Sequence, residues 1–296
     1  MNRVREIVNC DYAHAKGFYG EGIGVAILDT GIAPHVDFIN NTNRIKVFID
    51  LVNRRKLPYD DCGHGTHVAG IIGGDGSDSK GKYRGIAPSC SFIIFKVLDS
   101  FGNGNVNNII KAIDWIIKYR HNYNIKIINI SVGAETSSDK SLKLLENYIE
   151  KAWNYGICVL LAAGNLGPSN GSVTCPGTNK KIITVGAYEE KLSKDTDSEI
   201  IYSGRGPTKE GIIKPEVVAP GYNIASCING KRGYVYKSGT SMSTPVVSGA
   251  MALCYDKYPF LTNKEAKILL YNTCTKTNKP KNVHGWGLLN VKALLS

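Results

Sequence analysis

The stretch GVAILDTG, residues 24–31, is an apolar run that ends in an aspartate and a Thr-Gly turn. A short apolar run bounded by turn residues is typical of a strand buried in a parallel sheet. Asp29 then stands at the carboxyl edge of that sheet, where α/β folds build their sites. The motif alone is weak evidence, because the carboxylate could equally accept backbone N–H groups of its own turn.

Similar apolar runs alternate with helix-like segments along the rest of the chain. We expect further buried strands over residues 92–97, 126–130, 157–161 and 182–185. Apolar residues at helical spacing predict helices over residues 106–119 and 142–153, and a Thr-Asn-Lys-Glu capping box at residues 262–265 opens a later helix. This alternation predicts an α/β fold with a parallel sheet wrapped by helices.

Composition favours one large domain. The chain has 296 residues, of which 43% are hydrophobic and 32 are glycine, and it has no linker-like stretch. It has no run of about 18 apolar residues and no signal-peptide pattern, so we expect a cytoplasmic protein that does not enter a membrane. The eight cysteines are scattered without a C-x-x-C pair, which favours reduced thiols in a cytosol.

The net charge of +11 comes from 36 Lys and Arg residues against 25 Asp and Glu residues. An excess of this size permits non-specific attraction to nucleic acid. However, the basic residues are spread along the chain, and the densest clusters, residues 54–56 and 279–281, lack interleaved aromatic residues. The sequence therefore favours a solvated surface without a nucleic-acid partner.

A second motif, GHGTHVAGIIGG at residues 63–74, places His64 between two glycines before an apolar run that can form a helix. His67 follows three residues later, so a metal-binding pair is the competing interpretation. The motif lacks the i, i+4 spacing and the intervening glutamate of zinc proteases, which argues against a metal.

A third motif, SGTSMSTPVVSGAMAL at residues 238–253, leads from a Gly-Thr-Ser turn into a helix that contains Pro245 near its start. Such a junction can expose the Ser241 oxygen and direct backbone N–H groups at an anion, as stabilisation of a tetrahedral oxyanion requires. Alternatively, the threonine and serine residues simply cap the helix.

Together, ILDTGI, HGTHVAG and GTSMSTP, in the order Asp, His, Ser, resemble the signature blocks of the subtilisin-like serine proteases. The resemblance continues through KVLDSFGNG, AAGN and KPEVVAPG, and the tract PYDDCGHGTHVAG is similar to the bacterial intracellular minor-subtilase branch. It implies a three-layer α/β fold with a mainly parallel central sheet flanked by helices. Residues 1–16 are expected to form a short N-terminal extension and residues 17–296 the peptidase domain.

The resemblance implies a serine endopeptidase that works through an acyl-enzyme intermediate. Ser241 is expected to attack the scissile carbonyl, His64 to take and return its proton, and Asp29 to orient the imidazole. Asn165 and the backbone N–H of Ser241 are expected to stabilise the oxyanion. A pseudoprotease that binds peptides without turnover is the main rival, and the intact motifs argue against it.

The resemblance also implies that protein or peptide substrates bind as an added strand. The expected substrate-binding residues are Ser131, Val132, Gly133, Ala162, Ala163, Gly164 and Thr174. None of them is acidic, so we expect an uncharged, apolar residue before the cleaved bond, with Thr174 limiting the depth of its pocket. The sequence leaves the oligomeric state open.

Catalysis in this family requires no cofactor, but relatives often bind structural calcium. Asp37 aligns with a ligand position of the family. Asp75 and Asp78 lie in an oxygen-rich loop that departs from the usual ligand run. The sequence therefore offers only weak candidates for a calcium site.

Cys62 lies only two residues before His64. A bulky reagent on its thiol would obstruct the imidazole or the groove beside it. A buried and inert cysteine is the alternative, because exposure cannot be deduced from the sequence.

Overall fold

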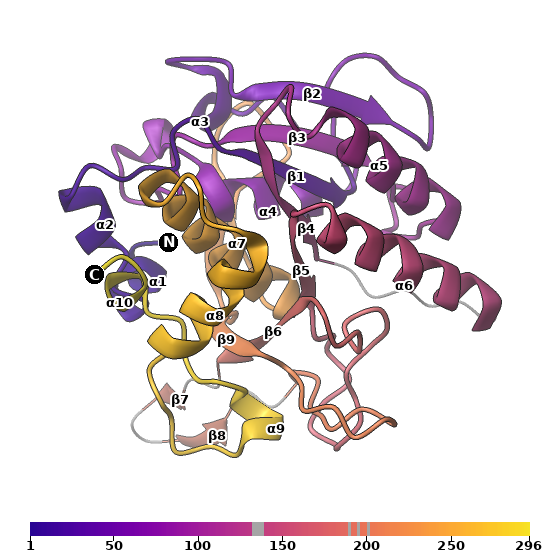
Figure 1. The fold of residues 1–296 in the computed structure, drawn as a ribbon. Helices are drawn as coiled ribbons and strands as arrows, with labels where there is room; N and C mark the ends of the chain where they lie inside the picture. The colour runs from indigo at the N-terminus through magenta and orange to yellow at the C-terminus, as the bar shows by residue number, and fades with distance from the viewer. Residues whose placement is uncertain (132–138, 189–190, 194–195, 200–201) are drawn as a thin grey trace.

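A parallel sheet forms the middle layer of the computed structural model, which describes residues 1–131, 139–188, 191–193, 196–199 and 202–296 (Figure 1). The strand order is β2-β3-β1-β4-β5-β6-β9, and every neighbouring pair is parallel. The strands are β1 (Gly24–Asp29), β2 (Ile45–Asp50), β3 (Ser91–Lys96), β4 (Ile125–Ile130), β5 (Cys158–Ala162), β6 (Ile183–Tyr188) and β9 (Val217–Pro220). All five strands predicted from apolar runs are present.

The sequence analysis missed β2 and β9. β2 lies at the edge of the sheet and is mostly half-buried, so it has no continuous apolar run. β9 is buried along its length but has only four residues. By contrast, β1 is buried at every residue, which explains why its sequence predicted a strand so clearly.

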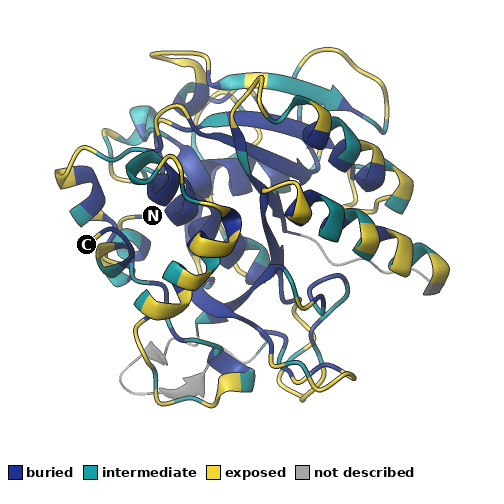
Figure 2. Cartoon of the chain, viewed as in Figure 1, coloured by how far each residue is buried: buried dark blue, intermediate teal, exposed yellow. Residues whose placement is uncertain are grey.

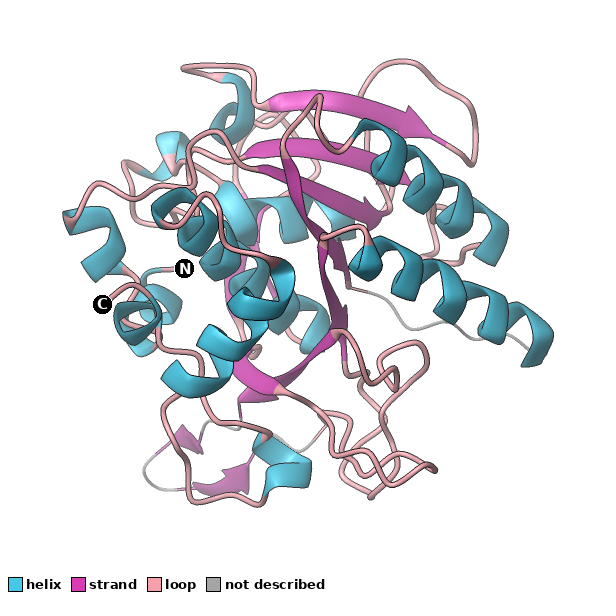
Figure 3. Cartoon of the chain, in the orientation of Figure 1, coloured by secondary structure: helices cyan, strands magenta, loops and turns pink. Residues whose placement is uncertain are grey.

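Helices cover both faces of the sheet (Figure 1 and Figure 3). α4 (His64–Gly73) and α7 (Thr240–Lys257) pack against one face. α5 (Val106–Tyr119) and α6 (Asp139–Asn154) pack against the other. This arrangement confirms the predicted three-layer α/β fold.

α7 runs through the interior of the protein (Figure 2). Its residues 242–255 are all buried, whereas Ser241 in its first turn is partly exposed. Small residues allow this close packing: a Cβ on Gly249 would lie only 2.6 Å from Ile86 Cβ. Pro245 lies in the second turn and lacks the N–H that would otherwise bond to the Ser241 carbonyl.

Both ends of the chain lie on the same side of the molecule (Figure 1). Residues 1–16 form α1 (Asn2–Ile7) and α2 (Asp11–Ala15), which contribute Val4 and Ala13 to the main core. The Val291 N–H at the start of α10 (Val291–Leu294) donates to the Val8 carbonyl at 2.8 Å. The N-terminal segment therefore packs on the body of the protein, and the domain boundary at residue 17 stays a prediction.

The predicted capping box is present at the start of α8 (Asn263–Thr273). The Glu265 N–H donates to Thr262 Oγ1 at 3.2 Å, and the Thr262 N–H donates to Glu265 Oε2 at 2.9 Å. The smaller elements are α3 (Val36–Ile39), η1 (Ser77–Ser79), β7 (Lys191–Ser193), β8 (Thr196–Glu199), β10 (Ile224–Cys227), β11 (Tyr234–Lys237) and α9 (Lys281–His284). Within the described ranges, every helix is too short or too polar to cross a membrane.

The carboxyl edge of the sheet gathers the three sequence motifs. β1 ends at Asp29, β4 leads to Ser131, and β5 leads to Asn165. Because the strands are parallel, these ends point to one side, where the first turn of α7 also brings Ser241.

Candidate active site

Asp29 and His64 form a hydrogen-bonded pair at the carboxyl end of β1. His64 Nδ1 lies 2.7 Å from Asp29 Oδ1, which also accepts the Thr30 N–H at 2.8 Å. Asp29 is fully buried, whereas the His64 side chain is 22% exposed. A carboxylate next to Nδ1 holds the proton on that nitrogen, so Nε2 of the neutral ring is the free acceptor.

The electrostatics of this pair favour a charged imidazole. Burial opposes the charge and lowers the pKa of His64, but the negative charge of Asp29 and its hydrogen bond outweigh burial and raise the pKa above 6.5. Asp29 therefore stabilises positive charge on the His64 ring.

The buried carboxylate of Asp60 joins the two segments that carry this pair. It accepts the Thr30 hydroxyl at 2.8 Å, the Gly63 N–H at 2.7 Å, and the N–H and hydroxyl of Thr66 at 2.8 and 2.6 Å. Burial opposes its charge, but the hydrogen bonds from Thr66, Gly63 and Thr30 hold the pKa of Asp60 below 3.8. The sequence analysis missed this residue, although it lies four positions before His64.

The two segments approach so closely that position 65 requires glycine. A Cβ on Gly65 would lie 2.2 Å from the Gly31 carbonyl oxygen and 3.2 Å from Asp29 Cβ. On the other side of His64, Gly63 precedes the helix with a φ of 84°, a conformation that favours glycine. The two flanking glycines thus allow α4 to begin directly against the Asp29 turn.

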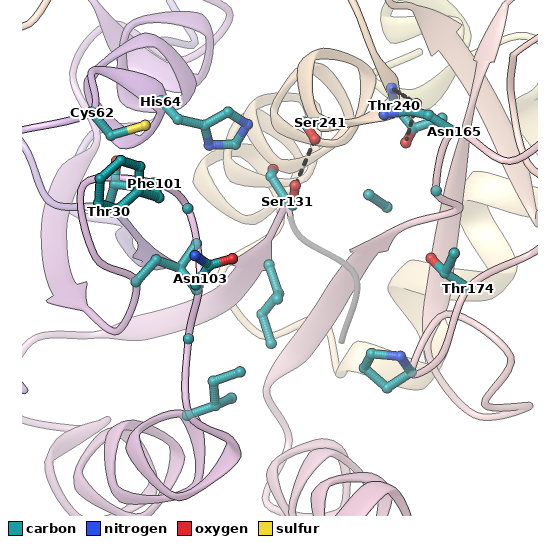
Figure 4. Close-up of a pocket in the computed structure, with 18 of the residues that line it drawn as sticks. Thr30, Cys62, His64, Phe101, Asn103, Ser131, Asn165, Thr174, Thr240 and Ser241 are labelled. Carbon is teal, nitrogen blue, oxygen red and sulfur yellow. Dashed lines mark hydrogen bonds between the residues drawn. The ribbon is translucent and has the colours of Figure 1, made fainter. Parts of the chain in front are cut away.

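Ser241 lies across the cleft from the His64 ring, in the first turn of α7 (Figure 4). Its hydroxyl donates to the Ser131 carbonyl at 2.6 Å, not to His64. The Ser131 hydroxyl in turn accepts from Asn129 Nδ2 at 2.9 Å. The end of β4 and the start of α7 are therefore joined at the residue that the third motif singles out.

Asn165 follows β5 and is fixed against the same start of α7. Its Oδ1 accepts the N–H and the hydroxyl of Thr240 at 3.0 and 3.1 Å. Because a backbone N–H can only donate, the atom that faces it must be the oxygen. Asn165 lines the cleft beside Ser241, so its Nδ2 is a donor available to a bound ligand.

A cleft of about 640 Å³ runs between these residues, a size typical of ligand sites. In Figure 4, Phe101 and Asn103 lie on one side and Asn165 and Thr174 on the other. Ser131 lies between the two sides. Leu98 and residues 101–104 also line the cleft, although the sequence analysis assigned them no role.

The predicted substrate-binding residues divide into three groups. Four of them line the cleft: Ser131, Ala162, Gly164 and Thr174. Ala163 is fully buried and lies behind the cleft lining, where its carbonyl accepts the Thr174 N–H at 3.0 Å. Val132 and Gly133 lie outside the described residues.

Comparison with known proteins shows to which family this chain belongs. The model of the subtilase family matches residues 20–287. This chain belongs to the subtilase family. Serine protease AprX of Bacillus subtilis (strain 168) is 39% identical to this subtilase over 295 residues, which cover 92% of the chain and 66% of AprX. The chain thus spans just under two thirds of that relative.

Other subtilases match over nearly their whole length. Subtilisin Savinase of Lederbergia lenta is 34% identical over 286 residues, which cover 97% of this chain and 95% of Savinase. The solved structure of Sphericase superposes with a TM-score of 0.76 at 28% identity, covering 93% of this chain and 96% of Sphericase. The resemblance predicted from the three motifs is therefore confirmed: this is a subtilisin-like serine protease by family.

Two of the calcium candidates of this subtilase are engaged with protein donors. Asp37 accepts the Asp78 N–H at 2.9 Å and the Tyr234 hydroxyl at 2.8 Å. Asp78 accepts the Arg232 guanidinium at 2.8 Å and the Gly233 N–H at 2.7 Å. Both carboxylates are thus hydrogen-bonded within the described part of the protein, and a role for them in binding calcium stays a prediction.

The third candidate, Asp75, is also hydrogen-bonded within the protein. One of its carboxylate oxygens accepts the Ser77 N–H at 2.8 Å, and the other lies 3.4 Å from the Asn41 amide nitrogen. Calcium binding by these three carboxylates therefore stays a prediction from the sequence.

His35, Asp37 and Cys227 bring three potential metal ligands within 4.8 Å of one another. His35 Nδ1 accepts the Asp37 N–H at 3.1 Å, and His35 Nε2 lies 3.0 Å from the Gly233 carbonyl, to which it donates. Burial, reinforced by the charge of Asp37, raises the pKa of the Cys227 thiol, which lies 3.6 Å from Asp37 Oδ2. In the described arrangement both ring nitrogens of His35 and the Cys227 thiol take part in hydrogen bonds, so the three side chains form a hydrogen-bond network.

Cys62 and Cys175 are the two cysteines that are not fully buried, and all eight cysteines are free. Cys62 lines the cleft, and Figure 4 shows its sulfur on the same side as the His64 ring. The Cys175 sulfur lies 3.7 Å from Glu146 Oε1, and burial together with the Glu146 charge raises its pKa to about 11. Cys62 is therefore the thiol placed to react at the cleft.

We predict that the imidazole of His64 titrates above pH 6.5 and that Asp29→Asn lowers its pKa. The variant removes the negative charge while the cost of burying the imidazolium remains. NMR titration of ¹⁵N-histidine, in protein that also carries Ser241→Ala to prevent self-cleavage, measures both values. Asp114→Asn, which removes an equal charge from the surface pair with Lys151, is the control. An unchanged His64 pKa in Asp29→Asn would contradict the electrostatic analysis.

We also predict that a maleimide or mercurial reagent inhibits peptide hydrolysis by this subtilase through Cys62. The modified sulfur obstructs the cleft beside His64. Initial rates before and after labelling, with mass spectrometry to locate the label, test this expectation. Cys62→Ser should stay active and lose most of its sensitivity to the reagent. Cys175→Ser should remain as sensitive as the unaltered enzyme. Full activity of enzyme labelled at Cys62 would show that the steric link to His64 is wrong.

Proposed function

We propose that this subtilase is a serine endopeptidase in which Asp29, His64 and Ser241 form the catalytic triad. The observation that carries the proposal is the 2.7 Å hydrogen bond between His64 Nδ1 and buried Asp29, on a ring that shares one cleft with Ser241. A neutral His64 Nε2 takes the proton of the Ser241 hydroxyl as its oxygen attacks the scissile carbonyl. The imidazolium then passes the proton to the leaving amine, and water hydrolyses the acyl-enzyme by the same route.

Ser241 must change its hydrogen bond before it can attack. Its hydroxyl is bonded to the Ser131 carbonyl, and rotation about one side-chain bond redirects it to His64. A peptide that pairs with the strand end at Ser131 competes for the same carbonyl and so favours the rotation.

The oxyanion of the tetrahedral intermediate is stabilised by Asn165 Nδ2 and the Ser241 N–H. Thr240 fixes the Asn165 amide in the orientation that leaves Nδ2 free to donate. A donor held in place before the reaction stabilises the developing charge without a cost of reorganisation.

The substrate lies as an extended peptide between residues 101–104 and Ser131, and main-chain pairing makes the enzyme tolerant of many sequences. The side chain before the cleaved bond enters the pocket bordered by Ala162, Gly164, Thr174 and Pro176. None of the described residues that line this pocket is acidic, so we propose that it accepts uncharged and apolar side chains. Thr174 packs against Gly164, where a Cβ would lie 2.4 Å from its hydroxyl, and it limits the depth of the pocket.

We predict that Ser241→Ala lowers kcat by about 10⁶-fold and that Asn165→Ala lowers it by about 10²–10³-fold. His64→Ala should match Ser241→Ala, since both remove the attack step. Chromogenic peptide hydrolysis, labelling by a fluorophosphonate probe and circular dichroism measure activity, nucleophile and fold. Ser243→Ala is the matched control, because the buried Ser243 hydroxyl has no hydrogen-bond partner in the described part of the protein.

Two outcomes would contradict this proposal. Undiminished turnover by Ser241→Ala, with contaminating protease excluded, would show that another residue is the nucleophile. A folded, unaltered protein that neither cleaves peptides nor reacts with the probe would instead support a pseudoprotease that only binds them.

We predict that Thr174→Gly raises kcat/KM for peptides with phenylalanine before the cleaved bond, relative to alanine, by about tenfold. The truncated side chain deepens the pocket by the volume of the lost hydroxyl and methyl groups. Ser172→Gly, two positions earlier and outside the cleft lining, should leave the ratio unchanged. An unchanged ratio in Thr174→Gly would show that another residue limits the pocket.

A further inference from the structure

Lys96, the last residue of β3, is fully buried and lies beside Asp29 of β1 in the sheet. Its ammonium group donates to the Thr30 carbonyl at 2.8 Å, the Leu98 carbonyl at 2.8 Å and Asp61 Oδ1 at 2.6 Å. An ammonium group has three N–H donors, so each has a partner. Among the three acceptors, only the Asp61 carboxylate carries a negative charge, and its side chain is 34% exposed.

The three acceptors belong to three different segments that border the cleft. Thr30 directly follows Asp29, and Asp61 directly precedes Cys62 on the segment that leads to His64. Leu98 begins the segment that runs along the substrate groove to residue 104. One buried cation therefore touches the Asp29 turn, the His64 segment and the groove edge.

Leu98 connects the Lys96 ammonium group to the groove edge through hydrogen bonds. Its N–H donates to the Asp29 carbonyl at 3.2 Å, while its own carbonyl is held by Lys96. Leu98 also pairs with Gly104 in an antiparallel bridge, and a Cβ on Gly104 would lie 2.4 Å from Leu98 Cδ2. A shift of Leu98 would therefore move the groove edge relative to Asp29.

A buried lysine is a costly way to fill space, because an apolar side chain of similar volume avoids the desolvation of a charge. Unlike an apolar side chain, the ammonium group forms directional hydrogen bonds. Its three short, charge-assisted bonds fix three segments of the chain relative to one another. We propose that Lys96 and Asp61 are positioning residues that set the groove edge, residues 98–104, in register with the Asp29–His64 pair. This inference rests on the proposed protease function and concerns substrates long enough to reach that edge.

The test compares two peptide p-nitroanilides with the same residue before the cleaved bond. A blocked tetrapeptide extends along residues 102–104, and a single blocked residue does not. For Lys96→Met and Asp61→Ala we expect kcat/KM for the tetrapeptide to fall by about 10–100-fold, mainly through KM, as the loss of a charge-assisted hydrogen bond implies. The single-residue substrate should lose less than about threefold. Active-site titration with a fluorophosphonate corrects for any unfolded fraction.

Two further variants separate positioning from general support of the fold. Asp61→Asn keeps an acceptor for Lys96 and should recover most of the tetrapeptide rate lost in Asp61→Ala. Lys214→Met is the matched control, because Lys214 is also fully buried and bonded to a carboxylate, Glu216 at 2.8 Å, but lies outside the cleft lining. Its effect should be the same for both substrates. If Lys96→Met does not fold, Asp61→Ala decides the question, since its partly exposed site tolerates truncation.

Equal losses for long and short substrates in Asp61→Ala and Lys96→Met would overturn the positioning role while leaving the protease function intact. The positioning role would also be overturned if Lys214→Met lowered kcat/KM for the tetrapeptide, relative to the single-residue substrate, by as much as Lys96→Met does. An unaltered protein that cleaves neither substrate and does not react with the fluorophosphonate would contradict the proposed function itself.

Discussion

The geometry of the site depends on the carboxylate of Asp60. It is buried, and N–H and O–H groups from the Asp29 turn and from the start of α4 converge on it. A hydrogen bond to a charged group contributes about 1.5–3 kcal/mol, and a buried charge without such partners is strongly unfavourable. The Thr30 hydroxyl reaches Asp60 only when the two segments lie together, and this arrangement brings His64 against Asp29.

The remaining groups of the site are held by rigid elements. Ser241 stands at the start of a helix buried along most of its length, and Asn165 is bonded to the residue before it. A site built on a buried helix and the ends of central strands is held more precisely than one built on loops. The proposed reaction requires the Ser241 hydroxyl to leave the Ser131 carbonyl and to bond to His64.

Charged side chains on the far side of α4 connect segments that are distant in the sequence. Asp37 binds Tyr234 of β11, and Asp78 binds Arg232 in the turn before that strand. The β10–β11 hairpin is thereby attached to α3 and to the loop after α4. Since the donors come from the protein itself, this attachment is present as soon as the chain is folded.

The sequence by itself determined β1, the His64 and Ser241 motifs and the parallel sheet, because apolar periodicity and turn residues are local properties of the chain. It predicted Asp37 as a calcium candidate, whereas the hydrogen bond from Tyr234 to that carboxylate is visible only in the tertiary structure. Only the tertiary structure also showed that Asp60 and Lys96 hold together the segments around the Asp29–His64 pair. Each of them bonds to at least one residue far away in the sequence, Thr30 in both cases and Asp61 for Lys96, and only the folded packing brings those residues together.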